Sequence, residues 1–407
     1  MPDVVRYMPA PTHEPTQPLV AIALTPTGRH PGAWREPDVT PATLLGARHW
    51  RSVIAAAEDA RADFVTFDDG FSVHRLDTDE TDITRTDVVA GQLDTQLLAA
   101  RLAPITTGVG LLPTVVTTHT EPFHASKSIA TLDYISRGRA GVVVTIDPRQ
   151  EHAALFGRRA LDSVSHADLL AEAADYAEVL RRLWDSWEDD AEIRHTATGR
   201  FIDRNKLHYI DFEGSQFSVR GPSITPRPPQ GQPIIAADLD NRSTSFVGTT
   251  ADIGFAVGSD DTAIADTITA ARTAEARAER AGSPLAILVD LLVVVDDTAA
   301  QARARRARFD ESAGSVYTGG IPVVAGTASD VADRIAELLD LGADGVRLHP
   351  AAIPHDLQRI AADLAPELRR RHRLRESYID GESLRSRLGL GRPESRYAIS
   401  ELVEAAR

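Results

Sequence analysis

Carboxylates follow two candidate strands, at positions where a β/α protein binds its ligand. Asp147 comes directly after the β-branched run at 141–146, and the segment Asp238 to Asn241 follows the apolar run at 234–237. Ligands of α/β folds bind at the carboxyl ends of parallel strands, so carboxylates there face any bound molecule and repel an anionic one. The structural alternative is that Asp147, followed by Pro148, only ends its strand and that Asp240 or Asn241 caps a helix.

The elements that position these residues alternate along the chain in a pattern typical of βα units. Strands are expected at Leu19–Leu24, Phe64–Phe67, Ile105–Leu111, Gly141–Ile146, Ile234–Ala237, Ile253–Val257, Leu285–Val295 and Gly345–Leu348. Helices are expected between them, among others at Ala47–Arg61, Ala167–Trp184, Thr262–Ala281, Ala299–Phe309 and Ser329–Leu341. Eight strands with intervening helices predict an α/β fold, the (β/α)₈ TIM barrel, as one domain over residues 1–407.

Two segments do not fit the repeat. Residues 186–232 are polar, aromatic and proline-rich, which predicts an insertion after the fourth helix with a hairpin over 212–219. Residues 371–407 follow the last barrel helix, and we expect this C-terminal tail to pack outside the barrel.

Composition excludes several kinds of chemistry. The chain has no cysteine, so thiolate nucleophiles, iron–sulfur clusters and cysteine-ligated zinc are ruled out, and redox chemistry would need a cofactor. No metal site is expected. A net charge of −15 argues against nucleic acid as a partner and favours a small molecule. No segment resembles a signal peptide or a membrane span, which predicts a cytoplasmic protein. Neither a dinucleotide GxGxxG loop nor a P-loop is present.

Six blocks of sequence carry a resemblance to a known group of enzymes. They are HPGAWREPD (30–38), TTHTEPFHASKSIATLDYISRGRAG (117–141), LWDSWEDDA (183–191), HYIDFEGSQFSVRGPS (208–223), GTASDVADRIAELLDLGADGVRL (326–348) and LRSRLGLGRP (384–393). The chain resembles the nitrilotriacetate monooxygenase, dibenzothiophene-sulfone monooxygenase and pristinamycin synthase group of the bacterial luciferase-like flavin monooxygenases. The resemblance implies an enzyme that takes reduced FMN from a separate flavin reductase and uses O₂ to oxygenate a small organic substrate. It also implies a homodimer or homotetramer.

The resemblance also implies roles for individual residues. Asp69 and Thr117 match positions beside the flavin ring, and His124 matches the histidine at the start of the third helix. His30 matches one of the histidines near the first strand that line the substrate entrance. We therefore take His30 and His124 as catalytic candidates, with a loop histidine and a helix-entry histidine as the structural alternatives.

The departures from the group gather where the FMN phosphate would bind. Val143 stands in place of an asparagine, Asp147 in place of a serine and Leu170 in place of a tyrosine. The group's Ala-Gly-Ser-Ser turn is replaced by Asp238, Leu239, Asp240 and Asn241. A carboxylate about 5 Å from a phosphate costs on the order of 3 kcal/mol per charge pair at an effective dielectric near 20. We therefore expect weakened or lost FMN binding, unless Arg149, Arg158, Arg159 or Arg242 neutralises these acids.

Two alternatives to a working FMN enzyme follow. The first is a flavin-free paralogue that acts as a binding or partner subunit, which the clustered departures favour. The second, weaker alternative is an oxidoreductase that uses the deazaflavin F420. The short connection at 310–324 also predicts a reduced lid over the substrate site, with less exclusion of water.

Overall fold

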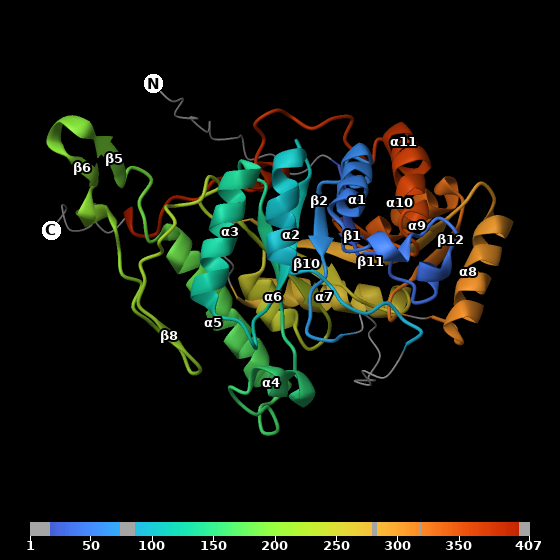
Figure 1. The fold of residues 1–407 in the computed structure, drawn as a ribbon, viewed down its shortest axis with the longest axis horizontal. Helices are drawn as coiled ribbons and strands as arrows, with labels where there is room; N and C mark the ends of the chain where they lie inside the picture. The colour runs from blue at the N-terminus through green and yellow to red at the C-terminus, as the bar shows by residue number, and fades with distance from the viewer. Residues whose placement is uncertain (1–16, 74–85, 279–282, 318, 399–407) are drawn as a thin grey trace.

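Eight parallel strands close into a barrel surrounded by helices (Figure 1). The computed structural model describes residues 17–73, 86–278, 283–317 and 319–398. The barrel strands are β1 (Leu19–Leu24), β2 (Phe64–Phe67), β3 (Gly110–Val116), β4 (Gly141–Thr145), β9 (Ile234–Leu239), β10 (Ile253–Ala256), β11 (Ala286–Val295) and β13 (Gly345–Pro350). Each strand pairs in parallel with two neighbours, and the β10–β11 and β1–β13 pairs complete the ring. The predicted TIM barrel is confirmed.

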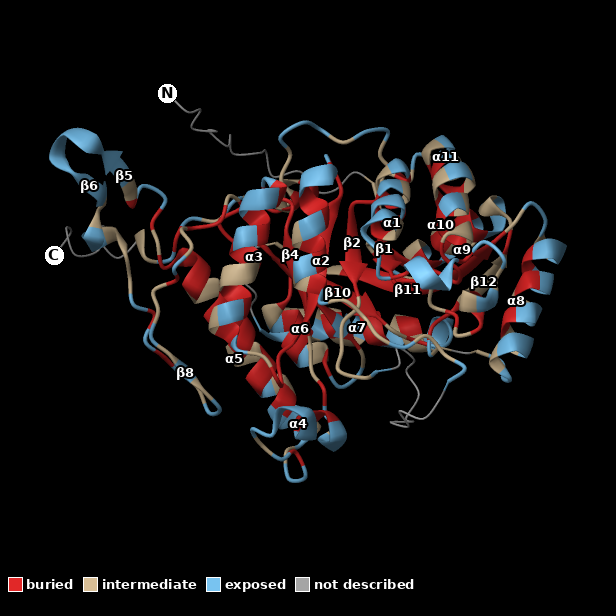
Figure 2. Ribbon diagram, in the orientation of Figure 1, coloured by how far each residue is buried: buried red, intermediate tan, exposed pale blue. Residues whose placement is uncertain are grey.

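The helices form the outer layer of the barrel. They are α1 (Ala47–Asp59), α2 (Thr95–Leu102), α3 (Pro122–Ser136), α4 (Gln150–Phe156), α5 (His166–Asp185), α6 (Thr244–Thr250), α7 (Asp261–Arg277), α8 (Ala299–Ala313), α9 (Ala328–Asp340), α10 (His355–Arg359), α11 (Ala365–Arg370) and α12 (Leu384–Arg387). The buried faces of the helices turn toward the strands, and the exposed faces turn outward (Figure 2). The last residues of the helix predicted at 262–281 lie outside the described residues.

The third strand begins five residues later than the sequence predicted. Residues Ala103–Ile105 form a 3₁₀ turn, and β3 starts at Gly110 instead of Ile105. The buried guanidinium of Arg139 donates hydrogen bonds to the carbonyl oxygens of Ala103, Thr106 and Val109. Because these carbonyls bind a side chain, they are not available to a strand ladder.

The short connection at 310–324, from which a reduced lid is predicted, begins and ends within secondary structure. α8 continues to Ala313, and β12 (Val323–Gly326) pairs in parallel with β11 at Leu292–Val295. Thr298 caps α8 by accepting a hydrogen bond from the backbone N–H of Gln301.

Residues that alternate along the strands point into the barrel. At the amino ends of the strands they form an apolar layer of Leu19, Ala21, Phe64, Leu112, Ile234, Ile253, Phe255 and Leu288. Toward the carboxyl ends the inward residues become polar, as with Asp290 on β11 and Arg347 on β13. The barrel therefore has an apolar base and a polar interior near its carboxyl end.

The C-terminal tail closes the base of the barrel, which corrects the expectation that it packs outside. Leu384, Leu388 and Leu390 are buried in the same cluster as the inward residues of the strands. The backbone N–H of Leu384 bonds to the carbonyl of Gly138, just before β4. Residues 399–407 of the predicted tail lie outside the described residues.

The insertion at 186–232 projects from one side of the barrel (Figure 1). It contains two antiparallel hairpins, β5–β6 (Glu192–His195 and Arg200–Ile202) and β7–β8 (Phe212–Glu213 and Ser218–Val219). The hairpin predicted over 212–219 is confirmed.

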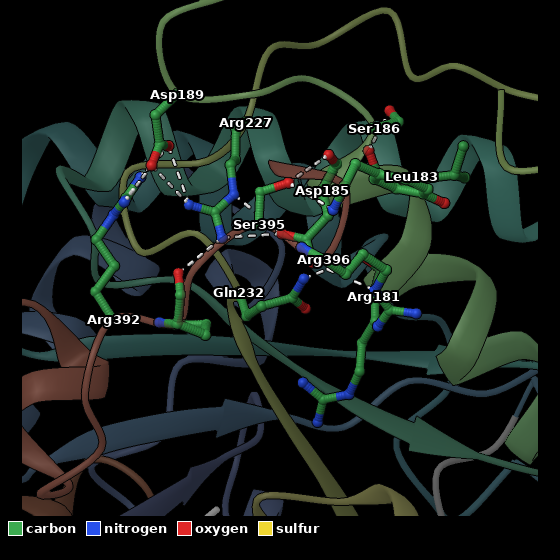
Figure 3. A network of polar contacts seen from close by, with 12 residues as sticks. Arg181, Leu183, Asp185, Ser186, Asp189, Arg227, Gln232, Arg392, Ser395 and Arg396 are labelled. Atoms are coloured by element: carbon green, nitrogen blue, oxygen red, sulfur yellow. Dashed lines mark hydrogen bonds and ion pairs between the residues drawn. The ribbon is translucent and has the colours of Figure 1, made fainter. Parts of the chain in front are cut away.

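A partly buried network joins the insertion to the tail (Figure 3). Arg227 of the insertion pairs with Asp185 at the end of α5 and with Asp189, and donates to the carbonyl of Pro393. Arg392 of the tail binds the same Asp189 at 2.6 Å. One cluster of charges therefore ties α5, the insertion and the tail together.

The leucine at the barrel base gives a test of the tail's structural role. Leu384→Ala should lower the free energy of unfolding by about 2–5 kcal/mol, because it opens a cavity beneath Phe64 and Gly110. Urea unfolding at pH 7 measures the change. Leu45→Ala, at a side chain that is 53% exposed, is the control and should change stability by less than about 0.5 kcal/mol. Equal effects of both variants would contradict the assigned role of the tail.

Candidate active site

A cavity of about 560 Å³ opens at the carboxyl ends of the strands. All eight barrel strands or the segments that follow them contribute to its lining, which includes Thr25, Arg29, His30, Asp68, Asp69, Ser72, Val143, Asp147, Arg149, Leu170, Asp238, Asp240, Arg242, Phe246, Asp290, Tyr317 and Arg347. This is the face on which TIM barrels carry their active sites. The volume lies within the range of about 300–1,000 Å³ that is common for cofactor sites.

Asp147 lies on the cavity wall in a polar cluster. Its carboxylate accepts hydrogen bonds from Arg149 Nε at 2.9 Å and from Arg149 Nη2 at 3.0 Å. His152 Nδ1 of α4 lies 2.6 Å from the other side of the same carboxylate, and the Asp147 N–H donates to Thr118 Oγ1. Although burial acts in the opposite direction, the hydrogen bonds from Arg149 and His152 lower the pKa of Asp147. Asp147 is therefore ionised and its charge is balanced.

The loop after β9 is organised around Asp240. Its carboxylate accepts from the backbone N–H groups of Arg242 and Ser243 at 2.8 Å and pairs with the Arg242 guanidinium at 3.0 Å. The predicted helix cap is not formed: Ser243 is the N-cap of α6 and no side chain of the described residues caps the helix, whereas Asp240 closes the turn before it. Asp240, like Asp147, has its own arginine.

The cavity floor holds a buried charge network. Arg347 binds Asp290 through Nε at 2.6 Å and Nη2 at 2.7 Å, and it reaches Asp238 at 3.0 Å. The Arg347 guanidinium lies 3.6 Å from the centre of the Phe255 ring. Although burial acts in the opposite direction, the charge of Arg347 lowers the pKa of Asp290. Burial raises the pKa of Asp238, although 52% of this side chain still faces the cavity.

His349 extends this network toward the first strand. Its Nδ1 lies 3.4 Å from Arg29 Nη1. Because a guanidinium only donates, Nδ1 accepts, and the proton sits on Nε2, 3.2 Å from Asp290. Burial lowers the pKa of His349, so the ring is neutral at pH 7. The floor therefore combines neutral and charged donors around Asp290.

His30 lies on the cavity wall with both ring nitrogens bonded. Nδ1 accepts from the Gly32 N–H at 3.1 Å, so Nε2 carries the proton and donates to Asp310 at 3.1 Å. Burial lowers the pKa of His30. Gly28 positions this loop: it has a φ of +97°, and a Cβ there would lie 2.3 Å from the Ala351 carbonyl oxygen. The ring is held in place and neutral.

Asp69 lies on the cavity wall and is bound by the start of α2. It accepts from the N–H of Thr95 at 3.1 Å, from Thr95 Oγ1 at 2.9 Å and from the N–H of Gly70 at 2.8 Å. Burial raises the pKa of Asp69, and the bonds from Thr95 oppose this.

Four predicted site residues lie away from the cavity lining of the described chain. Thr117 uses its hydroxyl to bind the Thr145 carbonyl between β3 and β4. His124 is exposed on α3, with its ring beside Phe123. Leu239 faces the helix layer because Asp238, its neighbour on β9, faces inward, and Asn241 is exposed in the turn. Of the arginines considered, Arg158 and Arg159 pair with Glu121 and Glu172 instead.

Sequence reasoning missed the charged floor. Asp290 and Arg347 lie within predicted strands and His349 follows one, but none of the three was predicted as a site residue. The available signal was the two-residue period of a strand: Asp290 follows the inward-facing Leu288 by two positions, and Arg347 and His349 follow Gly345 by two and four. Ser72 and His152 were missed because one follows β2 and the other lies on α4, and their proximity depends on the folded barrel.

Comparison with known proteins identifies the family. The profile described as Luciferase-like monooxygenase matches residues 35–317, which is more than half of the chain. The chain belongs to the luciferase-like monooxygenase family. It is an enzyme of this flavin-dependent kind, whose members use reduced flavin. Within the described residues, no helix has both the length and the apolar character to cross a membrane.

Two relatives match this luciferase-like monooxygenase over nearly their whole length. N-acetyl-S-(2-succino)cysteine monooxygenase of Bacillus subtilis is 27% identical, covering 95% of this chain and 100% of the relative. Nitrilotriacetate monooxygenase component A of Aminobacter aminovorans is also 27% identical, covering 91% and 96%. Among solved structures, riboflavin lyase with modified FMN and riboflavin is 25% identical, with a TM-score of 0.81 over 92% of this chain and 96% of that one.

The donor set of the cavity fits a flavin. Val143, Leu170 and Phe246 supply apolar wall for a planar ring system. Thr25 Oγ1 also lines the cavity, and it is buried with no hydrogen-bond partner among the described residues, so it can bind a polar ring edge. Arg149 and Arg242 stand at the cavity for an anionic tail.

The buried floor pair gives a stability test. Arg347→Met leaves Asp290 and Asp238 without their cation and should lower the free energy of unfolding at pH 7 by about 3–5 kcal/mol. Urea unfolding measures this loss. Arg370→Met removes an arginine that is 69% exposed and paired with Glu367, and it should cost less than about 1 kcal/mol.

The stability difference between wild type and Arg347→Met should also depend on pH. Because Asp290 has a lowered folded pKa, its pairing stabilises the fold above about pH 4 and loses this effect as pH falls toward the folded pKa. The stability gap between wild type and Arg347→Met should therefore narrow between about pH 5 and pH 3. A gap that stays constant or widens over this range would contradict the assigned charge state.

Proposed function

We propose that this luciferase-like monooxygenase is the oxygenase component of a two-component system. It would bind reduced FMN from a separate flavin reductase and oxygenate a small organic molecule. The relative described as component A of nitrilotriacetate monooxygenase supports a division of labour with a second component. When bound, reduced flavin supplies the electrons that activate O₂; the chain supplies position, dryness and electrostatic field.

The observation that carries this proposal is the charge balance at the cavity. Asp147 and Asp240 would each repel a phosphate by on the order of 3 kcal/mol if they stood alone. Arg149 and Arg242 pair with them directly, so these four side chains have no net charge. The repulsion expected from the sequence is offset, while the attraction that free arginines would provide is reduced. We therefore propose that FMN binds, with a small contribution from its phosphate.

The chain's own residues have distinct tasks in this proposal. The apolar wall at Val143 and Leu170 would hold the flavin ring and exclude water from it. Asp69 is fixed by Thr95 and would orient one edge of the ring. His30, held by Gly32 and Asp310, would present a neutral ring surface to the substrate without exchanging a proton.

The connection after α8 supplies part of the cover. Tyr317 and Ile321 line the cavity, and the Tyr317 N–H bonds to Asp310, the partner of His30. This segment would place the substrate next to His30. A short cover of this kind favours a small substrate.

Anaerobic titration with reduced FMN tests the proposal. Saturable binding is expected in the micromolar range, and reduced riboflavin should bind within about tenfold of it, because the phosphate contributes little. Arg149→Gln and Arg242→Gln should each weaken FMN by leaving a carboxylate unpaired, with little effect on riboflavin. Arg370→Gln, on the outer surface, is the control.

The alternatives predict different results in the same experiment. No saturable binding of either flavin up to high micromolar concentration would remove the proposal and favour the flavin-free partner subunit. Binding of F420 with no binding of FMN would favour the deazaflavin alternative. Binding of FMN more than about a hundredfold tighter than riboflavin would contradict the proposed weak phosphate contribution.

We also propose a homo-oligomer. The projecting insertion exposes Phe201 by 61%, Tyr209 by 52% and Ile224 by 66%, which provides apolar surface for a second copy. Light scattering at several protein concentrations measures the mass, and a monomer at all of them would contradict this.

A further inference from the structure

Three side chains at the cavity are arranged as nucleophile, base and orienting acid. Ser72 Oγ lies 3.1 Å from His152 Nε2, and His152 Nδ1 lies 2.6 Å from Asp147 Oδ2. They come from the loop after β2, from α4 and from the end of β4. A Ser-His-Asp triad is recognised by this geometry and by these roles, whatever the order of the residues in the chain.

The hydrogen bonds fix the direction in which protons can move. A carboxylate only accepts, so Nδ1 of neutral His152 carries the proton that bonds to Asp147. The lone pair of His152 then lies on Nε2, and the Ser72 hydroxyl donates to it. Asp147 is itself held by two hydrogen bonds from Arg149 and by the Thr118 hydroxyl. The base is therefore oriented in the tautomer that can deprotonate a serine.

The surroundings of the triad suit reaction with a neutral carbonyl compound. Ser72 is partly exposed and lines the cavity, whereas His152 is 4% exposed and Asp147 is 3% exposed. Arg149 Nη1 lies 3.4 Å from Ser72 Oγ, so a cation stands where negative charge develops on an attacked carbonyl oxygen. Phe71, next to Ser72, packs edge to face on Phe156 at 4.7 Å. The Ser72 hydroxyl therefore has an apolar neighbour.

We infer that Ser72, His152 and Asp147 form a second reactive centre, which hydrolyses carboxylic esters of small acyl groups. Ser72 Oγ bonds to the carbonyl carbon as its proton passes to His152 Nε2. The carbon–oxygen bond to the leaving alcohol breaks, and that alcohol takes the proton from His152. Water then attacks the acyl-serine and gives its proton to His152, which returns it to Ser72 as the carboxylic acid leaves. No oxidant or flavin takes part, so this activity goes beyond the proposed function.

Hydrolysis of p-nitrophenyl acetate by the flavin-free protein is the first test. The wild type should release nitrophenol above the buffer rate, and Ser72→Ala, His152→Ala and Asp147→Asn should each return to the buffer rate. A fluorophosphonate should label the tryptic peptide 62–75, in which Ser72 is the only serine. Ser245→Ala, at an exposed serine outside the cavity lining of the described residues, is the matched control and should keep both properties.

The absence of cysteine allows a second test that does not depend on ester choice. Ser72→Cys introduces the only thiol of the chain, and a thiol beside a base reacts as its thiolate. Alkylation by iodoacetamide at pH 7 should be at least about tenfold faster than in Ser245→Cys, although Ser245 is more exposed. Adding His152→Ala to Ser72→Cys should abolish this advantage. Circular dichroism checks that each variant is folded.

The outcomes distinguish a hydrolytic centre from a structural support for Asp147. Fast alkylation of Ser72→Cys that depends on His152, together with Ser72-dependent hydrolysis of the acetate by the wild type, supports the inference. Fast alkylation without hydrolysis of the acetate overturns the assignment of ester hydrolysis. Alkylation no faster than in Ser245→Cys, or labelling that is unchanged in His152→Ala, overturns the inference and leaves the three residues as a brace for Asp147. None of these results depends on whether reduced FMN binds, since flavin is absent throughout.

Discussion

The carboxyl end of this barrel depends on the pairing of four cavity carboxylates with arginines. Asp290 and Asp238 share Arg347, Asp147 binds Arg149, and Asp240 binds Arg242. Unpaired, a buried carboxylate would cost several kcal/mol or would take up a proton. Because each pair is formed within the chain, the polar carboxyl end of the barrel is compatible with an apolar base closed by Leu384 and its neighbours.

This pairing also shapes the chemistry available at the cavity. A phosphate site made of hydroxyls and backbone N–H groups attracts an anion, whereas a site of balanced pairs is nearly neutral toward it. The same pairing orients His152 toward Ser72 through Asp147. The residues that we propose to weaken phosphate binding are thus also part of the proposed hydrolytic centre.

The sequence predicted the architecture because short strands of period two alternate regularly with clearly helical stretches. It misplaced the third strand because the start of β3 depends on Arg139, whose carbonyl partners come from a turn about thirty residues earlier. It missed the tail's role because the leucines of 384–390 resemble those of any helix end, and only the closed barrel provides the space that they fill.

The site was predicted less completely than the fold. Site residues that directly follow a strand, such as Asp147 after β4 and Asp240 after β9, were predicted from the sequence. Their arginine partners, Arg149 and Arg242, were among the arginines considered. His124 and Leu239 were placed by resemblance, and local geometry turns them away from the cavity. The contacts of Arg347 with Asp238 and of Ser72 with His152 join residues 109 and 80 positions apart, so no local pattern could reveal them.

We propose that the arginine-paired carboxylates leave the cavity neutral enough to accept reduced FMN. A crystal grown anaerobically with reduced FMN tests this proposal. The flavin ring should lie against Val143 and Leu170 and the phosphate beside the guanidinium groups of Arg149 and Arg242, with both aspartate pairs intact. A fully occupied crystal in which the phosphate displaces either arginine from its aspartate, or in which the cavity holds no flavin, would contradict it.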